Sequence, residues 1–132
     1  MHFFISTKGH YDFIDITLKV REIVASSEKK EGAVLVFARG STVALTLIEN
    51  ESGIFEDLKS VLEKLIPEHF DYNHNKNSGD KNGAAHIKSA IFQPEVIIPF
   101  ANNELLLGPW QQIVLIDFDE RPRDREIIVK II

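Results

Sequence analysis

Runs of alternating or continuous apolar residues, separated by turn residues, predict most of the chain to be β structure. Gly9 marks a turn after the first run, and the short segment that follows it either extends the first strand or pairs with it across that turn. The predicted strands are HFFISTK (2–8) with YDFID (11–15), GAVLVFARG (32–40), STVALTLIEN (41–50), EVIIPF (95–100), ELLL (104–107), WQQIVLIDFD (110–119) and EIIVKII (126–132).

Two segments change to a helical period. From Asp15, a plausible N-cap, apolar residues recur on one face through residue 24. Ser52 opens a second helix with a continuous apolar stripe, which Pro67 ends. The segment AAHIKSAIF (84–92) is consistent with a third, shorter helix.

These elements predict an α+β fold: antiparallel, sandwich-like sheets of about seven strands with two or three flanking helices. The tight spacing of the last strands predicts antiparallel meanders. With 132 residues, of which 44% are apolar, we expect a single domain over residues 1–132. The C-terminal strand, residues 126–132, carries five Ile or Val residues and is either a central strand or part of a subunit interface.

The totals exclude several classes of function. The net charge is −5 and the basic residues are scattered, so no nucleic-acid partner is expected. There is no cysteine, which removes disulfides and thiolate chemistry, and no apolar run is long enough to span a membrane. The N-terminus lacks the pattern of a signal peptide, so we expect a cytoplasmic protein without a membrane partner. No phosphate loop, hydrolase elbow or zinc-protease motif occurs.

The most polar stretch, YNHNKNSGDKNGAAHIKSA (72–90), holds two of the five histidines, His74 and His86. Neutral imidazole is a common metal ligand and a proton shuttle near pH 7. Two imidazoles supply only part of a zinc site, which needs three or four ligands. Loop histidines without a function are also common, so the spacing alone leaves both interpretations open.

Three further places carry candidate chemistry. Glu49 ends an apolar strand and is either a site carboxylate or part of a solvated turn. Trp110, the only tryptophan, follows Gly108 and either fills the core or belongs to a site. Arg123 and Arg125 suit phosphate recognition and would project to the same face of a following strand, although a charged hairpin turn with solvated side chains is slightly favoured.

Four motifs in this order resemble the YjbQ family, known as secondary thiamine-phosphate synthase enzymes. They are STVALTLIEN, YNH followed by NGAAHIKS, LLLGPWQ, and DFDERPRDR. The resemblance runs from about Phe13 to the C-terminus. It implies a compact α+β protein with antiparallel sheets and flanking helices, assembled as a homotrimer.

The resemblance also implies which residues form the site. The polar segment corresponds to the family's site, with His74, His86 and Glu49 as catalytic residues and the two histidines as ligands of a divalent metal, zinc or magnesium. The residues expected to bind a cofactor or ligand are Ser41, Thr42, Asn82, Trp110, Gln111, Arg123 and Arg125.

This chain departs from the family's pattern at two positions. Gly40 stands where the family usually has a histidine, so a three-histidine metal site cannot form from these positions. Pro109 replaces a residue that is usually threonine. Glu49 is the only substitute oxygen ligand that the motifs suggest.

We therefore expect a small cytoplasmic trimer whose pocket binds a phosphate-bearing small molecule. As an enzyme it would resemble a thiamine-phosphate synthase, a transferase that joins a thiazole phosphate to a pyrimidine pyrophosphate with loss of pyrophosphate. The alternative is a non-catalytic ligand-binding or regulatory protein that has lost the family's metal site.

Overall fold

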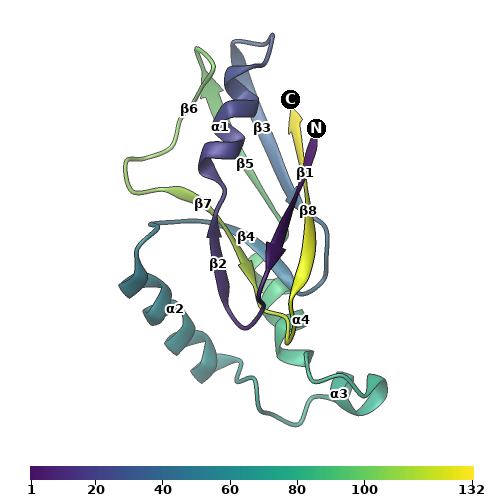
Figure 1. Ribbon diagram of the computed structural model, residues 1–132. Coiled ribbons are helices and arrows are strands. Elements are labelled where there is room, and N and C mark those ends of the chain that lie inside the picture. Colours follow the sequence, from purple (N-terminus) through teal and green to yellow (C-terminus); the bar gives the residue numbers. More distant parts are fainter.

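The computed structural model describes all 132 residues and contains eight strands and four helices (Figure 1). In chain order the elements are β1 (His2–Thr7), β2 (Asp12–Asp15), α1 (Thr17–Ala25), β3 (Glu31–Ala38), β4 (Val43–Ile48), α2 (Ser52–Leu65), α3 (Asn73–Ser78), α4 (Gly83–Phe92), β5 (Glu95–Ala101), β6 (Glu104–Leu105), β7 (Gln112–Asp117) and β8 (Arg123–Ile131).

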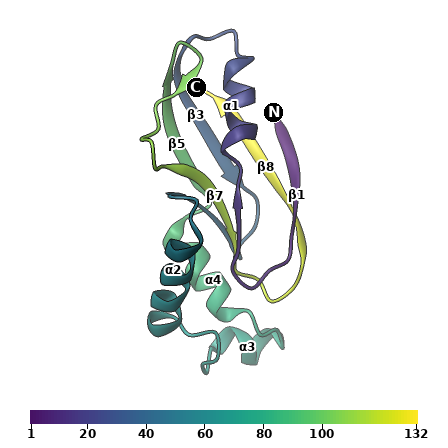
Figure 2. The same ribbon diagram turned by 60° about the vertical axis from the view of Figure 1, so that its left-hand side comes forward.

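The strands form two antiparallel sheets, which confirms the α+β class. Sheet A has five strands in the order β1-β8-β3-β5-β6, and sheet B has three in the order β2-β7-β4. Helices α2, α3 and α4 lie together beside sheet B, while α1 lies near the other end of the molecule (Figure 2).

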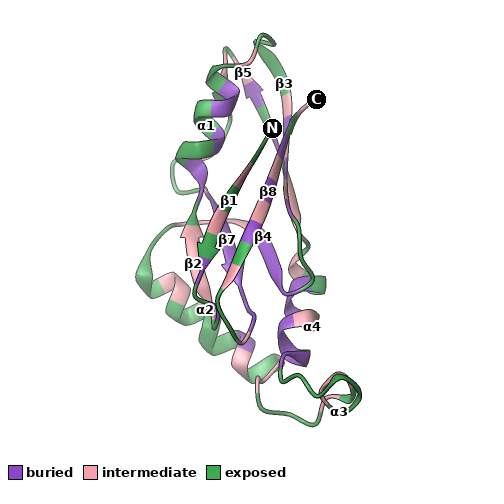
Figure 3. Cartoon of the chain, turned by 45° about the vertical axis from the view of Figure 1, so that its right-hand side comes forward, coloured by how far each residue is buried: buried purple, intermediate pink, exposed green.

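Strands β4 and β7 separate two apolar cores because their side chains alternate between the faces of sheet B. Leu45 and Leu115 point into the main core, which α1 and the inner face of sheet A complete. Val114 and Ile116 point the other way, into a smaller core closed by α2 and α4. Strand β7 is therefore covered on both faces, whereas β1 is largely exposed (Figure 3).

The turn at Gly9 is present, but its strand pairing differs from the prediction. Strand β1 pairs with β8 in sheet A, and β2 pairs with β7 in sheet B, so the turn carries the chain from one sheet to the other. Gly9, His10 and Tyr11 all have positive φ, and a Cβ on Gly9 would lie 2.7 Å from the carbonyl oxygen of Asp119. Because the turn packs this closely against Asp119, β1 and β2 do not pair with each other in a hairpin.

The C-terminal strand is central, the first of its two predicted roles, because β8 lies between β1 and β3. The meander expected for the last strands is only partly correct, since β7 and β8 are consecutive but belong to different sheets. Part of the polar segment is helical (α3), which the pattern did not predict. None of the four helices is both long enough and apolar enough to cross a lipid bilayer.

Candidate functional site

The structure divides the predicted site residues between the two ends of β4 and β7. The His–Arg end lies where β4 begins and β7 ends, and comprises Ser41, Thr42, His74, Asn82, His86, Arg123 and Arg125. The Trp end lies where β4 ends and β7 begins, and comprises Glu49, Trp110 and Gln111. At a rise of about 3.4 Å per residue, the length of β4 puts the two ends roughly 20 Å apart. One chain therefore does not bring all the predicted residues together.

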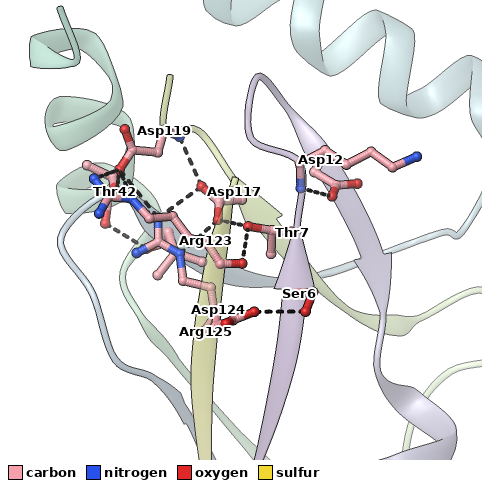
Figure 4. Close-up of polar contacts among 12 residues, drawn as sticks. Ser6, Thr7, Asp12, Thr42, Asp117, Asp119, Arg123, Asp124 and Arg125 are labelled. Atoms are coloured by element: carbon pink, nitrogen blue, oxygen red, sulfur yellow. Dashed lines mark hydrogen bonds and ion pairs between the residues drawn. The ribbon is translucent and has the colours of Figure 1, made fainter. Parts of the chain in front are cut away.

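Arg125 is buried in an ion pair at the centre of the His–Arg end (Figure 4). Its Nε donates to Oδ2 of Asp117 at 2.8 Å, and its Nη2 donates to Oδ1 at 2.9 Å. Asp117 is fully buried, and the Thr7 hydroxyl and the Asp119 backbone N–H also donate to it. Arg125 itself is 7% exposed, so the interpretation of a solvated turn arginine is wrong.

Asp119 connects this ion pair to the histidines. Its carboxylate accepts from the Thr42 hydroxyl, from Nε of Arg123 and from Nδ2 of Asn82. Burial alone would raise the pKa of Asp119, but these donors outweigh it and hold the pKa below its ordinary value. Arg123 and Arg125 project to the same side of β8, as predicted, and both are paired with an aspartate.

The two imidazoles meet in space. The ring centroids of His74 and His86 are 4.5 Å apart, and the ring planes are inclined at 61°. A ring nitrogen of His74, Nε2, lies 3.0 Å from Oδ1 of Asn82, the residue that precedes α4. Burial and the neighbouring His74 lower the pKa of His86, against the charge of Asp119 and a hydrogen bond with the Ser41 backbone. His86 is therefore neutral at pH 7, a form that can donate or accept a proton.

The residues of one chain do not complete a metal site. No three His, Asp or Glu side chains converge where they could hold a metal ion. Asp119, the carboxylate nearest to the imidazoles in this network, is already bound by Thr42, Arg123 and Asn82. Glu49 lies at the Trp end and cannot replace the missing third ligand within the same chain. Structural and catalytic zinc sites need at least three protein ligands.

The Trp end is an open surface. Trp110 is 72% exposed, so the interpretation of a core tryptophan is wrong. It lines a shallow pocket with Glu49, Asp15 and Asn50, among others. Gln111 closes a tight turn instead of entering this pocket, since its side-chain oxygen accepts from the Gly108 N–H at 2.8 Å. The Glu49 carboxylate has no hydrogen bond or ion pair within the chain.

Sequence reasoning missed a buried cationic group on the other side of α4. Lys88 is inaccessible and donates to the Tyr11 hydroxyl and to the Glu63 carboxylate. The Tyr11 hydroxyl also donates to Glu63, which ties β2, α2 and α4 together. Burial alone would raise the pKa of Glu63, but the hydrogen bonds from Lys88 and Tyr11 lower it to about 2. A lysine within the mainly apolar run AAHIKSAIF was the available signal.

The aspartates were also missed, although the sequence marks them. Asp117 interrupts the apolar run IVLIDF, and an ionised side chain inside a buried strand requires a partner. Arg125 follows eight residues later, on the strand to which the chain next passes. This pair of observations was enough to suggest a buried Asp–Arg pair.

Comparisons with known proteins agree with the motif resemblance. A family profile described as "UPF0047 protein YjbQ-like" matches residues 1–132. A UPF0047 protein of Archaeoglobus fulgidus is 37% identical over 130 residues, covering 98% of each chain. A UPF0047 protein of Methanothermobacter thermautotrophicus is 34% identical and covers 96% of this chain and 87% of its own.

Solved structures give the same result. A YbjQ-like protein of unknown function from Sulfolobus solfataricus superposes with a TM-score of 0.92 at 30% identity, covering 99% of this chain and 94% of its own. An uncharacterised YjbQ/UPF0047 protein from Clostridium acetobutylicum gives 0.90 at 33% identity, covering 100% and 99%. The chain described here belongs to the YjbQ-like UPF0047 family.

Proposed function

We propose that the His–Arg end binds a phosphate-bearing small molecule. The observation that carries this proposal is the set of donors that the network leaves free. Nη1 of Arg123 and Nη1 of Arg125 make no hydrogen bond within the chain, whereas the other nitrogens of both guanidinium groups are engaged. The exposed Ser41 hydroxyl is also unpaired. Guanidinium and hydroxyl donors grouped in this way suit the oxygens of phosphate.

The fixed charges of this end balance, since two arginines face two aspartates. Selectivity for an anion therefore comes from directed N–H and O–H donors and from the imidazoles, and less from net charge. Because the pKa of His86 is lowered, its protonation on acidification adds positive charge where the phosphate would lie. Phosphate affinity should accordingly rise as the pH falls below neutrality.

Isothermal titration calorimetry with inorganic phosphate and pyrophosphate tests the proposal. His86→Ala should weaken binding at least tenfold, about 1.4 kcal/mol. His69→Ala is the matched control, because His69 is exposed and lies outside the His–Arg network. The proposal fails if the parent protein shows no saturable binding, or if the two variants bind equally well.

We also propose a homotrimer, which is supported by the outer face of sheet A. No helix packs on this face, which carries apolar residues on four adjacent strands beside charged ones such as Glu126 and Lys130. Phe4 is 64% exposed and Ile97 is 60% exposed, and they flank half-buried residues of the central strands. The apolar residues of this face are Phe4 (β1), Ile128 (β8), Leu35 and Phe37 (β3), and Ile97 (β5). Such a surface is typical of a subunit contact.

Light scattering tests the assembly directly. The parent should have three times the chain mass of 15.0 kDa, and Ile97→Lys should dissociate it because burying an unpaired ammonium group is costly. Leu18→Lys is the control, since Leu18 is 77% exposed on α1, away from this face. A monomeric parent would contradict the proposal.

A trimer would also explain how the Trp end can belong to the same site. In a cyclic assembly, unlike surfaces of neighbouring copies meet. We propose that the Trp end of one copy lies against the His–Arg end of the next, because the separation within one chain is too large for both to contact one ligand. Glu49, Trp110 and Gln111 then take part in the site only between copies.

Mixed assemblies distinguish a shared site from a site within one chain. Trp110→Ala and His86→Ala subunits should each bind phosphate poorly when alone. After denaturation and joint refolding in equal amounts, random association would restore about one quarter of the sites, each built from one intact Trp end and one intact His–Arg end. Unimpaired binding by Trp110→Ala alone would contradict the shared site.

The reaction, if there is one, would be the thiamine-phosphate synthase type of transfer, with His74 and His86 holding a divalent metal or the phosphate itself. The incomplete metal site instead favours the second candidate, a non-catalytic ligand-binding or regulatory protein. Metal analysis of protein purified without chelator separates these candidates. Stoichiometric zinc or magnesium would support the enzyme, and metal-free protein that still binds phosphate would support the binding protein.

A further inference from the structure

The guanidinium group of Arg125 is held rigidly and is open on one side only. Its Nε and Nη2 are bound to Asp117, and Nη2 also donates to the Thr42 hydroxyl at 2.7 Å. The side chain is 8% exposed, and no fully buried side-chain nitrogen or oxygen of the protein lacks a partner. Nη1, which has no partner, must therefore retain some access to solvent.

Gly40 lies directly over this nitrogen. A Cβ at position 40 would be 2.6 Å from Nη1 of Arg125 and 3.0 Å from a methyl carbon of Val43. A heavy-atom separation of 2.6 Å is well inside van der Waals contact, so any side chain here would cover Nη1 or displace it. The φ of Gly40 is +144°, a conformation that also disfavours other residues.

We propose that Gly40 is a specificity-determining residue, because it leaves Nη1 of Arg125 uncovered for one oxygen of a terminal phosphate group. This inference rests on the proposed phosphate site. It identifies Nη1 of Arg125 as the atom that recognises the terminal phosphate. Ser41 follows Gly40 directly, and its backbone lies close to His86. An oxygen that reaches Nη1 past Gly40 therefore lies beside the free Ser41 hydroxyl and the imidazole pair.

The ligand class follows from this geometry. A terminal phosphate can present one oxygen to the recessed Nη1 and another to donors at the surface, such as Ser41. Phosphate esters and free phosphate share this chemistry. A planar carboxylate offers two oxygens in one plane and should bind more weakly, which makes acetate a useful comparison ligand.

The test substitutes the glycine without changing any charge. Gly40→Ala should weaken the binding of inorganic phosphate at least tenfold, measured by calorimetry. Gly79→Ala is the matched control: Gly79 also has positive φ, and a Cβ there would meet nothing within 4 Å. The control should bind phosphate as the parent does, which shows that an alanine at a positive-φ glycine elsewhere in the chain does not by itself weaken binding.

A second measurement serves if Gly40→Ala does not fold. In the parent, nitrogen-detected NMR of arginine side chains should show the Nη1 resonance of Arg125 shifting with phosphate, and much less with acetate. Phosphate binding by the parent with an unmoved Arg125 resonance, or with unchanged affinity in a folded Gly40→Ala, overturns the role of Gly40. Absence of phosphate binding to the parent would instead overturn the proposed function.

Discussion

The two ends of β4 and β7 were both expected to belong to one site, yet they are built differently. At the His–Arg end, Asp117 and Arg125 are buried and almost every polar group has a partner within the chain. At the Trp end, Trp110 is 72% exposed and the Glu49 carboxylate is unpaired. The first end is preorganised by its own chain. The second presents groups whose partners, if they exist, lie outside it.

This difference shows why sequence motifs alone do not define a site. Ser41, Thr42 and Glu49 occur within one motif of ten residues, but an extended strand separates its first residues from its last by most of the sheet. Residues from distant motifs meet instead, as His86 meets Ser41 and Asn82 meets Asp119.

The largest expected effect comes from breaking the buried ion pair. Asp117→Ala removes the only bidentate partner of Arg125 and should destabilise the fold by about 3–5 kcal/mol, because a charge is left buried without compensation. Urea denaturation followed by circular dichroism measures this change. Glu49→Ala at the Trp end should change the free energy of unfolding by less than about 0.5 kcal/mol. Equal losses in both variants would remove the contrast between the ends.

A smaller effect is expected at Thr42, because its hydroxyl links Asp119 to Arg125, the partner of Asp117. It donates to Asp119 at 2.8 Å and accepts from Nη2 of Arg125 at 2.7 Å. Thr42→Val keeps the shape but leaves both partners short of a bond, at a cost of about 1–3 kcal/mol in the free energy of unfolding. Thr46→Val is the control, because Thr46 lies on the following strand, β4, and is only half-buried. A fully stable Thr42→Val would show that water replaces the hydroxyl.

The pH dependence of stability should follow Glu63 and Asp119, the two carboxylates of the buried networks whose pKa values are lowered. The pKa of Glu63 is about 2 in the folded protein against an ordinary value of 4.5, so the unfolded chain binds more protons between these values. The free energy of unfolding should therefore fall as the pH is lowered from about 4.5 towards 2. Asp119, whose pKa is also lowered, acts in the same direction.

Unfolding measured at a fixed urea concentration over a range of acidic pH values gives this dependence of stability on pH. Since Glu63 is about one-third exposed, its share is modest, and Glu63→Gln should flatten the curve only in part. An unchanged curve in Glu63→Gln would contradict the assignment to this residue.

Much of the fold was predictable because local patterns decide it. The apolar stripe of α2, its start at Ser52 and its end before Pro67 could be read directly from the sequence. The pairing of β2 with β7 could not, because Gly9, His10 and Tyr11 adopt three successive positive φ values that only their packing against the β7–β8 connection explains. Residues Asn73–Ser78 form a helix, although they have no apolar face from which a helix could be predicted.

The site was predictable in part for a similar reason. The motif resemblance assigned all these residues to one site, and the structure brings His74, His86, Asn82 and both arginines to one end. It could not show that Arg125 is buried or that Trp110 is roughly 20 Å away. Burial depends on which strands become neighbours, and that is a property of the whole sheet. The unpaired Nη1 beneath Gly40 depends on how closely two segments distant in sequence approach each other, which no sequence pattern encodes.

The most direct test of the central claim is a phosphate titration of the uniformly labelled protein, following all five imidazoles by NMR near pH 6.5. If the His–Arg end binds phosphate, the His74 and His86 resonances shift along one saturation curve and the lowered pKa of His86 rises in the complex. His2 and His69, which line pockets that contain no residue of this end, should stay in place. Shifts confined to those two histidines, or no saturable shift at all, would contradict the claim.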